Sequence, residues 1–456
     1  MIASVTEFLS WMGVACSTPS EVPVQDVVID SRQAGAGSVF FALDGAQVDG
    51  HHFVAGALER GAVLAVIRKG HEEAGRWLAD ARVVAVDDPV VALQHAARAY
   101  RKTFDVPVIA ITGSNGKTTT KEMAAAVLGE RYRLCYTSGN YNNHLGLPLS
   151  ILSWTRDMEM AILEMGTNHF GEIRLLCDIA RPTHGVITNI GKGHLEFFRD
   201  LEGVARAKGE LLESMDDNGR AFLNGDDPHL IRRADVVSQT VTYGFSEDCD
   251  LRGEALPPDA EGHPGLRIEK EIIRVPLLGR HNLMNALAAV AVGRSLHVGW
   301  DQIRHAFQIF QPVKQRSQVQ HAGGVTVIND AYNANPSSMA EALVALSEIP
   351  GPGRRVAVLG DMAEMGAASH DEHRLLGALV HRLELDALFS FGPEMHRAHE
   401  RAAALGVPVT MHFDSAQSLI EQVKTCLESG DAVLVKGSRS MAMERVAEAL
   451  IQHFSS

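Results

Sequence analysis

The sequence has few cysteines, no excess of positive charge and no long apolar run. Its five cysteines among 456 residues are scattered and odd in number, so neither a disulfide framework nor metal-ligand spacing is expected. This pattern of cysteines is typical of proteins in a reducing compartment, so we expect the protein to be cytoplasmic. The N-terminus carries Glu7 and no basic stretch, which argues against a secretory signal. No apolar run approaches the ~20 residues that span a bilayer, so we expect no membrane insertion. The cysteines are Cys16, Cys135, Cys177, Cys249 and Cys426.

The net charge of −14 argues against a nucleic-acid or anionic-membrane partner, which would need a basic face, but leaves room for a local basic pocket for phosphates. Hydrophobic residues make up 46% of the chain, which is enough for several cores. At ~150 residues a domain, the length predicts three domains, and we place their boundaries at 1–88, 89–311 and 312–456. We expect a monomer.

One stretch, residues 106–128, has the pattern of a phosphate-binding loop. An apolar strand runs to Thr112, a glycine turn follows over 113–116, and a helix begins near Lys117. Free backbone N–H groups and the helix dipole favour a phosphate at such a turn. Lys117 would contact the β- and γ-phosphates, and the Thr118 hydroxyl would bind Mg²⁺. The candidate ATP-binding residues here are Gly113, Ser114, Asn115, Gly116, Lys117, Thr118 and Thr119.

The loop is shorter than the usual consensus, which has four residues between its first glycine and the Gly-Lys pair. Ile111 stands where that first glycine belongs, and only two residues separate Gly113 from Gly116. The alternative is an ordinary glycine-rich turn between a strand and a helix.

Two further side chains follow predicted strands. Glu164 lies at the C-terminal end of the strand 159–166, and His194 follows the strand 183–190. Ligands of open α/β sheets bind beyond the carboxyl ends of the strands, so Thr118, Glu164 and His194 could share a divalent cation. Mg²⁺ fits the oxygen donors best. Alternatively, Glu164 could be a capping or salt-bridging carboxylate and His194 a histidine with a purely structural role. Lys208, on a predicted helix over 200–213, is of interest only because it is near this site.

Weaker signals lie on either side of the phosphate loop. Ser31, Arg32 and His51 could hold a phosphorylated ligand, or could belong to surface turns. Asn142 and Asn143 belong to an amide-rich loop over 137–148 that could face a ligand or simply connect two elements. His281 and Asn282 offer a stacking ring and a donor–acceptor pair for a purine, or are merely the start of a helix.

The region after a linker at 311–316 alternates strands and helices, which predicts a doubly wound, Rossmann-like domain. Its strands are expected at 325–329, 355–360, 387–391 and 431–436. A helix over 337–348 should be capped by Ser337 or Ser338. The first turn has no Gly-x-Gly-x-x-Gly, so a dinucleotide site is not supported. The fold class is therefore α/β, with a small N-terminal α/β domain, a central mononucleotide-binding domain and this C-terminal domain.

These motifs resemble those of the Mur ligase family of ATP-dependent, amide-forming enzymes. The shortened loop Thr112-Gly-Ser-Asn-Gly-Lys-Thr118 is the family's own form. The resemblance continues in order through nearly the whole chain. The other matching segments are Asp30-Ser-Arg32, Asp49-Gly-His51, Gly139-Asn-Tyr-Asn-Asn143, Leu163-Glu-Met-Gly166, His194, Ala207-Lys208, Gly279-Arg-His-Asn282, Arg316, Asp330-Ala-Tyr-Asn-Ala-Asn-Pro-Ser-Ser-Met339, Leu359-Gly-Asp-Met-Ala-Glu-Met-Gly366 and Val435-Lys-Gly-Ser-Arg-Ser440.

The later segments resemble the family member that adds D-alanyl-D-alanine to UDP-N-acetylmuramoyl-tripeptide in peptidoglycan synthesis. The resemblance implies that ATP phosphorylates the terminal carboxylate and that the dipeptide amine attacks the acyl phosphate. It implies catalytic roles for Lys117, Glu164, His194 and Lys208. Two Mg²⁺ ions are implied, with Lys208 carbamylated to N6-carboxylysine and so able to help hold the second ion with His194.

The resemblance also assigns the weaker candidates. His281 and Asn282 would bind adenine, and Arg316 and Asp330 would reach the nucleotide from the third domain. Asn142 and Asn143 would contact the muropeptide. Ser31, Arg32 and His51 would hold its UDP-sugar end.

Two other functions are compatible with part of this pattern. One is a sibling ligase that adds a single amino acid, such as the tripeptide-forming enzyme or a folylpolyglutamate synthetase. The other is a regulatory module that hydrolyses ATP slowly as a switch and needs no second Mg²⁺ site. Residues 330–336 and 435–439 favour the dipeptide-adding enzyme.

Overall fold

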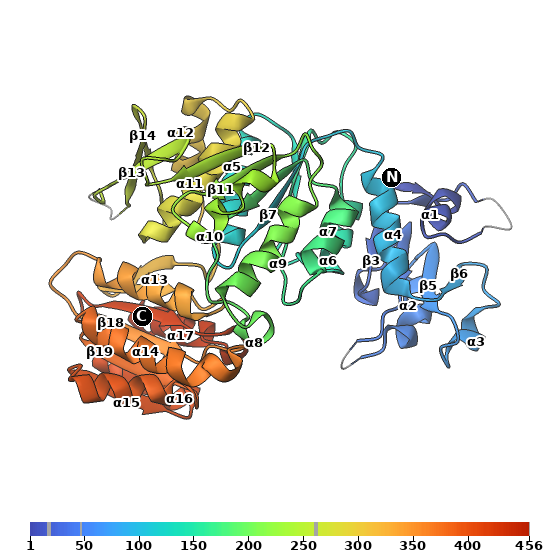
Figure 1. Cartoon of the computed structure of the whole chain (residues 1–456). Coiled ribbons are helices and arrows are strands. Elements are labelled where there is room, and N and C mark those ends of the chain that lie inside the picture. The colour runs from blue at the N-terminus through green and yellow to red at the C-terminus, as the bar shows by residue number, and fades with distance from the viewer. Residues whose placement is uncertain (16–19, 46–47, 260–262, 456) are drawn as a thin grey trace.

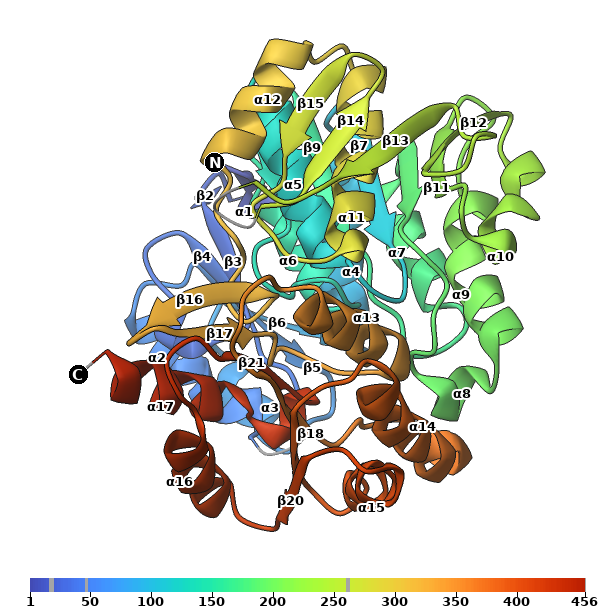
Figure 2. The ribbon, with the colours of Figure 1, turned by 90° about the vertical axis from the view of Figure 1, so that its left-hand side faces the viewer.

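A computed structural model describes residues 1–15, 20–45, 48–259 and 263–455. Its three α/β units lie along the chain from blue to red in Figure 1, and Figure 2 shows them from the side. The α/β class predicted from sequence is confirmed. Cys16 lies outside the described residues, and so do residues 46–47, for which the sequence predicts part of a loop over 44–53.

The N-terminal unit is built on a four-stranded parallel sheet with the order β3-β4-β5-β6, beside a two-stranded antiparallel pair. Phe8 and Phe41 of this unit share one hydrophobic cluster with Leu93 and Ala97 of α4, so the unit is joined to the central one by a continuous core. Its elements are β1 (Ala3–Ser4), α1 (Val5–Trp11), β2 (Pro23–Val24), β3 (Asp26–Val28), η1 (Ser31–Gln33), β4 (Ser38–Phe41), η2 (Gly50–Phe53), α2 (Val54–Glu59), β5 (Leu64–Arg68), α3 (Ala74–Trp77) and β6 (Val83–Val86).

The central unit is a nine-stranded sheet with the order β15-β14-β13-β12-β11-β10-β7-β9-β8. Strand β7 is buried on both faces, because Val108 and Ala110 pack into one cluster while Ile109 and Ile111 pack into the other. Its elements are α4 (Pro89–Arg101), β7 (Val108–Thr112), α5 (Lys117–Gly129), β8 (Leu134–Tyr136), α6 (Gly146–Leu152), β9 (Met160–Glu164), α7 (Glu172–Ala180), β10 (His184–Ile187), α8 (Leu195–Phe198), α9 (Leu201–Glu213), β11 (Arg220–Asn224), α10 (Pro228–Ile231), η3 (Ala234–Val236), β12 (Gln239–Gly244), β13 (Leu251–Leu256), β14 (Gly265–Ile268), β15 (Glu271–Arg274), α11 (Arg280–Ser295) and α12 (Trp300–Ile309).

The C-terminal unit is a six-stranded sheet with the order β16-β17-β21-β18-β19-β20, in which only β16 is antiparallel to its neighbour. Its elements are β16 (Gln318–Ala322), β17 (Val325–Asn329), α13 (Pro336–Ser347), β18 (Arg355–Gly360), η4 (Gly366–Ala368), α14 (Ser369–Arg382), β19 (Ala387–Phe391), α15 (His396–Leu405), β20 (Val409–Phe413), α16 (Ala416–Cys426), β21 (Ala432–Lys436), η5 (Arg439–Met441) and α17 (Glu444–Phe454).

The cap of α13 differs from the prediction. Asn335, and neither Ser337 nor Ser338, is the N-cap residue: its side chain accepts a hydrogen bond from the Ser338 N–H. Pro336 occupies the first helical turn, where its missing N–H costs nothing. In the sequence, the Asn335-Pro336 pair marks this helix start, although the prediction did not use it.

The central and C-terminal units meet through their loops. Short helix α8 reaches toward the C-terminal unit in Figure 1, and the Glu196 N–H donates to the Glu364 carbonyl over 3.3 Å. Lys192 and Glu372 form an ion pair of 2.6 Å across the same boundary. No helix within the described part of the chain is both long and apolar enough to cross a membrane.

Candidate functional site

The phosphate loop joins β7 to α5 at the carboxyl edge of the central sheet. Gly113 has φ +146°, and a Cβ atom there would lie 1.9 Å from Thr188 Oγ1. Gly116 has φ +78°, and its Cβ would lie 2.2 Å from Asn285 Oδ1. Neighbouring side chains therefore press against the loop at both glycines. The resulting tight turn, at the N-terminus of a 13-residue helix, is suited to binding phosphate.

The Lys117 side chain folds back over this loop. Its Nζ donates to the carbonyl oxygens of Gly113, at 2.8 Å, and Ser114, at 3.2 Å. Loss of surrounding water lowers the pKa of the Lys117 ammonium group, which Glu164 partly restores. A phosphate in the turn would therefore meet a positive charge that is already positioned and poorly hydrated.

Glu164 ends β9 beside the loop and is only 2% exposed. Thr118 Oγ1 donates to its Oε2 over 2.8 Å, and Asn142 Nδ2 donates to its Oε1 over 2.7 Å. A hydroxyl and a carboxylate thus lie together next to the phosphate turn. Mg²⁺ prefers hard oxygen donors of this kind, so Thr118 and Glu164 could hold one such ion.

His194 follows β10 and faces the C-terminal unit. Its backbone is left-handed, with φ +53°, and its Nδ1 lies 2.5 Å from Glu364 Oε2. Burial lowers the pKa of the His194 imidazole, although the Glu364 carboxylate opposes that shift. Because Nδ1 is engaged by the carboxylate, Nε2 is the ring nitrogen available to another ligand.

Lys208 lies on α9 and is 2% exposed. It forms no hydrogen bond or ion pair with any residue that the structure describes. Burial, and then the positive charge of Lys117, lowers the pKa of the Lys208 ammonium group well below its usual value. A buried amine with a lowered pKa more readily takes its nucleophilic, neutral form, which fits the expected carbamylation.

The candidate adenine residues begin α11. Asn282 is buried, and its Nδ2 donates to the Leu278 carbonyl over 2.7 Å and lies 3.1 Å from His281 Nε2. Asn285, which the sequence reasoning missed, donates to Asn282 Oδ1 over 3.0 Å. His281 lies where the phosphate cleft meets a neighbouring cavity of about 770 Å³, also lined by Phe245. That position suits a base attached to a bound phosphate chain.

The C-terminal unit contributes the opposite wall. Asp330 follows β17, and its Oδ2 accepts from Lys436 Nζ over 2.6 Å. Lys436 ends β21, the neighbouring strand, and is a further residue that the sequence reasoning did not select. Arg316 stacks on the Tyr332 ring, with its guanidinium carbon 3.9 Å from the ring centre. One acid and two cations therefore face the phosphate loop from the C-terminal unit.

These two walls enclose a cleft of about 400 Å³. Gly113 and Lys208 do not line it, and neither do the N-terminal candidates Ser31, Arg32 and His51. The candidate site residues that the cleft brings together are Ser114, Asn115, Gly116, Lys117, Thr118, Thr119, Asn142, Asn143, Glu164, His194, His281, Asn282, Arg316 and Asp330.

The boundary of the cleft includes another contact between domains. Asn335 Nδ2 donates to Asn115 Oδ1, in the phosphate loop, over 2.7 Å. The same Asn335 caps α13. The Asn-Pro pair at the start of α13 could have identified Asn335 as a cap. Its other partner, Asn115, is 220 positions away and could not be predicted from the sequence.

The N-terminal candidates lie at the carboxyl edge of the small sheet. Arg32 is exposed and binds the Asp30 carboxylate, with Nη2 2.7 Å from Oδ2. The neighbouring Ser31 begins η1, which Asp30 caps. Asp30 thus holds the guanidinium group in place while leaving it open to solvent, a position from which it could meet a phosphate.

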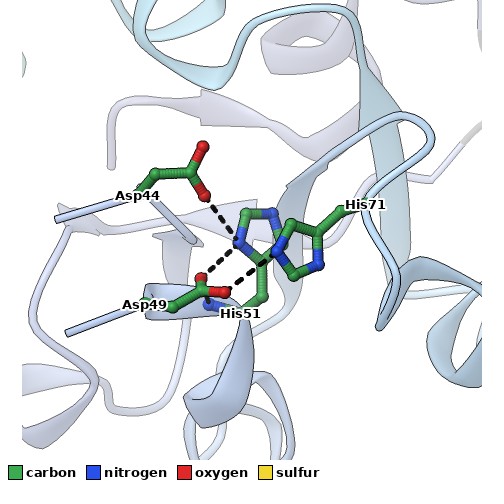
Figure 3. Close-up of side chains that lie close together, drawn as sticks. All are labelled: Asp44, Asp49, His51 and His71. Atoms are coloured by element: carbon green, nitrogen blue, oxygen red, sulfur yellow. Dashed lines mark hydrogen bonds and ion pairs between the residues drawn. The ribbon is translucent and has the colours of Figure 1, made fainter.

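His51 is instead fully buried, and both of its ring nitrogens are occupied. Nε2 accepts the Arg68 N–H over 3.0 Å, so the proton of the neutral ring is on Nδ1, 2.7 Å from Asp49 Oδ1. Figure 3 shows the His71 ring stacked on that of His51, with ring centres 3.8 Å apart. A direct contact of His51 with the UDP-sugar stays a prediction; its observed role is to hold the loop.

The same cluster has the composition of a metal site, because Asp44 and Asp49 lie beside His51 and His71. Its hydrogen bonds argue against one. His71 Nδ1 accepts the Glu73 N–H over 3.2 Å, so its Nε2 proton points to Asp49. The one lone pair of each neutral imidazole therefore already accepts a hydrogen bond from a backbone N–H. To bind a metal, either ring would have to give up that hydrogen bond or lose the proton on its other nitrogen.

Comparison with known proteins agrees with this architecture. Three family models match the chain: "Mur ligase family, catalytic domain" over residues 23–101, "Mur ligase middle domain" over 111–293 and "Mur ligase, glutamate ligase domain" over 315–439.

Relatives of known name match over almost the full length. The chain is 35% identical to the UDP-N-acetylmuramoyl-tripeptide–D-alanyl-D-alanine ligase of Bacillus subtilis (strain 168), over 94% of this chain and 93% of that protein. It is 33% identical to the ligase of the same name from Escherichia coli (strain K12), over 94% of both.

Solved structures of similar proteins superpose along the whole chain. The crystal structure of MurF from Acinetobacter baumannii is 29% identical, covers 99% of both chains and gives a TM-score of 0.87. MurF ligase from Thermotoga maritima in complex with ADP is 29% identical, covers 96% of this chain and 99% of that one, and gives a TM-score of 0.84. Sequence, site and fold agree, and this chain belongs to the Mur ligase family.

Proposed function

We propose that this chain joins D-alanyl-D-alanine to UDP-N-acetylmuramoyl-tripeptide at the expense of ATP, giving the UDP-N-acetylmuramoyl-pentapeptide used to build peptidoglycan. One observation carries the proposal: Lys117, Glu164 and His194 of the central unit line a single cleft with Asp330 and Lys436 of the C-terminal unit. The names of the relatives support the choice of the two substrates. We further propose that it acts in the cytoplasm as a monomer.

ATP binds with its phosphates in the turn over 113–116 and its adenine near His281 and Asn282. Lys117 exchanges its carbonyl partners for phosphate oxygens, and the charge on its ammonium group is then favoured. Arg316 and Asp330 approach the nucleotide from the C-terminal unit. The ADP complex of the similar Thermotoga protein supports nucleotide binding by this fold.

Two anions, the γ-phosphate and the tripeptide carboxylate, must then approach each other. Thr118 and Glu164 would hold one Mg²⁺, and His194 with a carbamylated Lys208 a second, and these ions would neutralise the charge of the transferring phosphoryl group. Lys117 contributes to the same neutralisation from the phosphate turn.

Lys208 prepares the site by reacting with CO₂. The neutral amine forms an N–C bond to CO₂ and releases one proton, so an uncharged side chain becomes an anion. Burial supports this step, since the pKa of the Lys208 ammonium group is well below its usual value.

The ligation itself takes two steps. A carboxylate oxygen of the tripeptide attacks the γ-phosphorus and the bond to the β-phosphate oxygen breaks, giving ADP and an acyl phosphate. The amine of D-alanyl-D-alanine then attacks the acyl carbon, the C–O bond to phosphate breaks, and the amine proton is released. Contacts between the domains, such as that of Asn115 with Asn335, keep water from the acyl phosphate.

Other candidates bind the muropeptide away from the reacting atoms. Asn142 and Asn143 contact its peptide portion. Ser31 and Arg32 contact the UDP-sugar end, and His51 holds the loop beside them.

Phosphate release that depends on the amine tests the proposal. The chain should release phosphate from ATP with UDP-N-acetylmuramoyl-tripeptide and D-alanyl-D-alanine, and mass spectrometry should show the pentapeptide. The assay includes tripeptides ending in meso-diaminopimelate and in lysine. Turnover with free meso-diaminopimelate or glutamate, but not with the dipeptide, would identify a sibling ligase instead. Phosphate release that needs no amine, and that survives His194→Ala, would identify a slow ATPase switch.

A further inference from the structure

A carboxylate from the C-terminal unit meets the side chain of His194 across the domain boundary. Glu364 Oε2 lies 2.5 Å from His194 Nδ1, and the two residues are 170 positions apart in the chain. The Glu364 side chain is 43% exposed and that of His194 27%, so the contact lies at the rim of the interface and not in a core. Glu364 has no role in the mechanism above.

The backbones on both sides are shaped for this contact. His194 and Glu364 have φ +53° and +57°, in the left-handed region that costs a residue with a side chain about 1–2 kcal/mol. The Glu196 N–H donates to the Glu364 carbonyl over 3.3 Å. At Gly366, an added Cβ would lie 3.2 Å from Glu196 Cα, so the two loops are in close contact. Strained residues that persist on both sides of a boundary indicate a constrained, functional geometry.

The chemistry of imidazole gives the contact a consequence. An ionised carboxylate only accepts hydrogen bonds, so Nδ1 of the neutral His194 ring carries the proton and Nε2 presents its lone pair. Carboxylates that bind the second nitrogen of a metal-binding histidine fix both its tautomer and its ring orientation.

We propose that Glu364 is a positioning residue, which orients His194 Nε2 toward the second metal ion only when the C-terminal unit is docked. This inference rests on the proposed function. Because Glu364 arrives with the C-terminal unit, docking and completion of the metal site become one event. ATP bound to an open enzyme would then lack a fully oriented His194, which would limit wasteful hydrolysis.

A second acidic contact in the same interface supplies a matched control. Glu372 binds Lys192, two residues before His194, over 2.6 Å, and its side chain is 13% exposed. This pair links the same two units but does not touch the imidazole. Glu372→Gln therefore removes one ion pair between the units but leaves the contact that holds His194 in place.

The test compares Glu364→Asn, Glu364→Gln and Glu372→Gln in the full chain. Asn tolerates the left-handed backbone but is too short to reach the ring, whereas the Gln amide oxygen can still accept from Nδ1–H. Bound Mn²⁺ is measured by electron paramagnetic resonance with ADP and UDP-N-acetylmuramoyl-tripeptide present, so that no turnover is required. The Mg²⁺ dependence of kcat is measured in parallel.

We expect Glu364→Asn to lower the Mn²⁺ affinity of the site that includes His194 by about 10–100-fold and to raise the Mg²⁺ requirement for turnover, while Glu364→Gln lowers that affinity by less than about tenfold. Glu372→Gln should bind Mn²⁺ as the wild type does. If Glu364→Asn does not fold, as judged by circular dichroism, Glu364→Ala replaces it.

Unchanged Mn²⁺ affinity in Glu364→Asn would overturn the inference. So would an equal loss in Glu372→Gln, since the effect would then come from docking in general. A wild-type chain that forms no pentapeptide would refute the proposed function, whereas normal product formation with unchanged Mn²⁺ binding in the Glu364 variants would refute only this inference.

Discussion

Replacing Glu164 with glutamine should separate catalysis from folding. Glutamine has the same size, so no cavity forms. Both hydrogen bonds can persist in neutral form, because the amide oxygen accepts from Asn142 and the amide nitrogen donates to the Thr118 hydroxyl. Hydrogen bonds to charged groups contribute ~1.5–3 kcal/mol against ~0.5–1.5 for neutral ones, so the exchange costs about 1–3 kcal/mol.

A gain offsets that cost. The Glu164 carboxylate is 2% exposed and forms no ion pair with a described residue, and burying such a charge costs several kcal/mol. The free energy of unfolding should therefore change by less than about 2 kcal/mol, measured by urea denaturation of the ligand-free chain. The loss of a Mg²⁺ ligand should lower kcat about 10²–10³-fold, or about 3–4 kcal/mol of transition-state stabilisation.

The assay is phosphate release with both substrates, and Glu59→Gln at the exposed end of α2, outside the cleft, is the control. A loss of more than about 3 kcal/mol in unfolding free energy would mean that Glu164 chiefly supports the fold. A kcat within about threefold of the wild type would refute its assignment as a metal ligand.

Three further outcomes are expected. Lys208→Ala should be inactive and should recover turnover with added short-chain carboxylic acids, which supply the missing carboxylate; equal activity with and without them would refute carbamylation. Gly116→Ala should lower the free energy of unfolding by about 1–3 kcal/mol, seen in urea denaturation, and raise the KM for ATP, because its φ is +78° and its Cβ would lie 2.2 Å from Asn285 Oδ1. Burial lowers the pKa of His184 to about 4, so the folded chain binds fewer protons there than the unfolded chain. Its contribution to stability is complete above about pH 6.5 and is lost as pH falls toward 4, by about 2–3 kcal/mol, so His184→Gln should flatten this part of a plot of unfolding free energy against pH.

The fold class followed from the sequence because its signals are local. Strand β18 was predicted with its observed bounds, since Arg355–Gly360 is an apolar run between turn residues. The cap of α13 was predicted wrongly, because Ser337 and Ser338 are favourable cap types and the Asn335-Pro336 pair was not weighed against them.

The site was predictable where one rule connects sequence to space. The carboxyl ends of parallel strands share an edge, so Thr118, Glu164 and His194 could be placed together from strand order along the chain alone. No comparable rule covers side chains that reach across domains. The pairing of Lys436 with Asp330 and that of Asn335 with Asn115 depend on how two units dock.

By itself, the sequence determined the phosphate turn, the sheet edge that surrounds it and the family, because backbone conformation and hydrophobic period act over a few residues. Only the tertiary structure decided that Lys208 is buried without a hydrogen-bond or ion-pair partner among the described residues, that His51 uses both ring nitrogens internally and that Glu364 reaches His194. Burial and hydrogen bonding depend on what surrounds a side chain from every direction. For these residues, the surroundings come from segments up to 170 positions away.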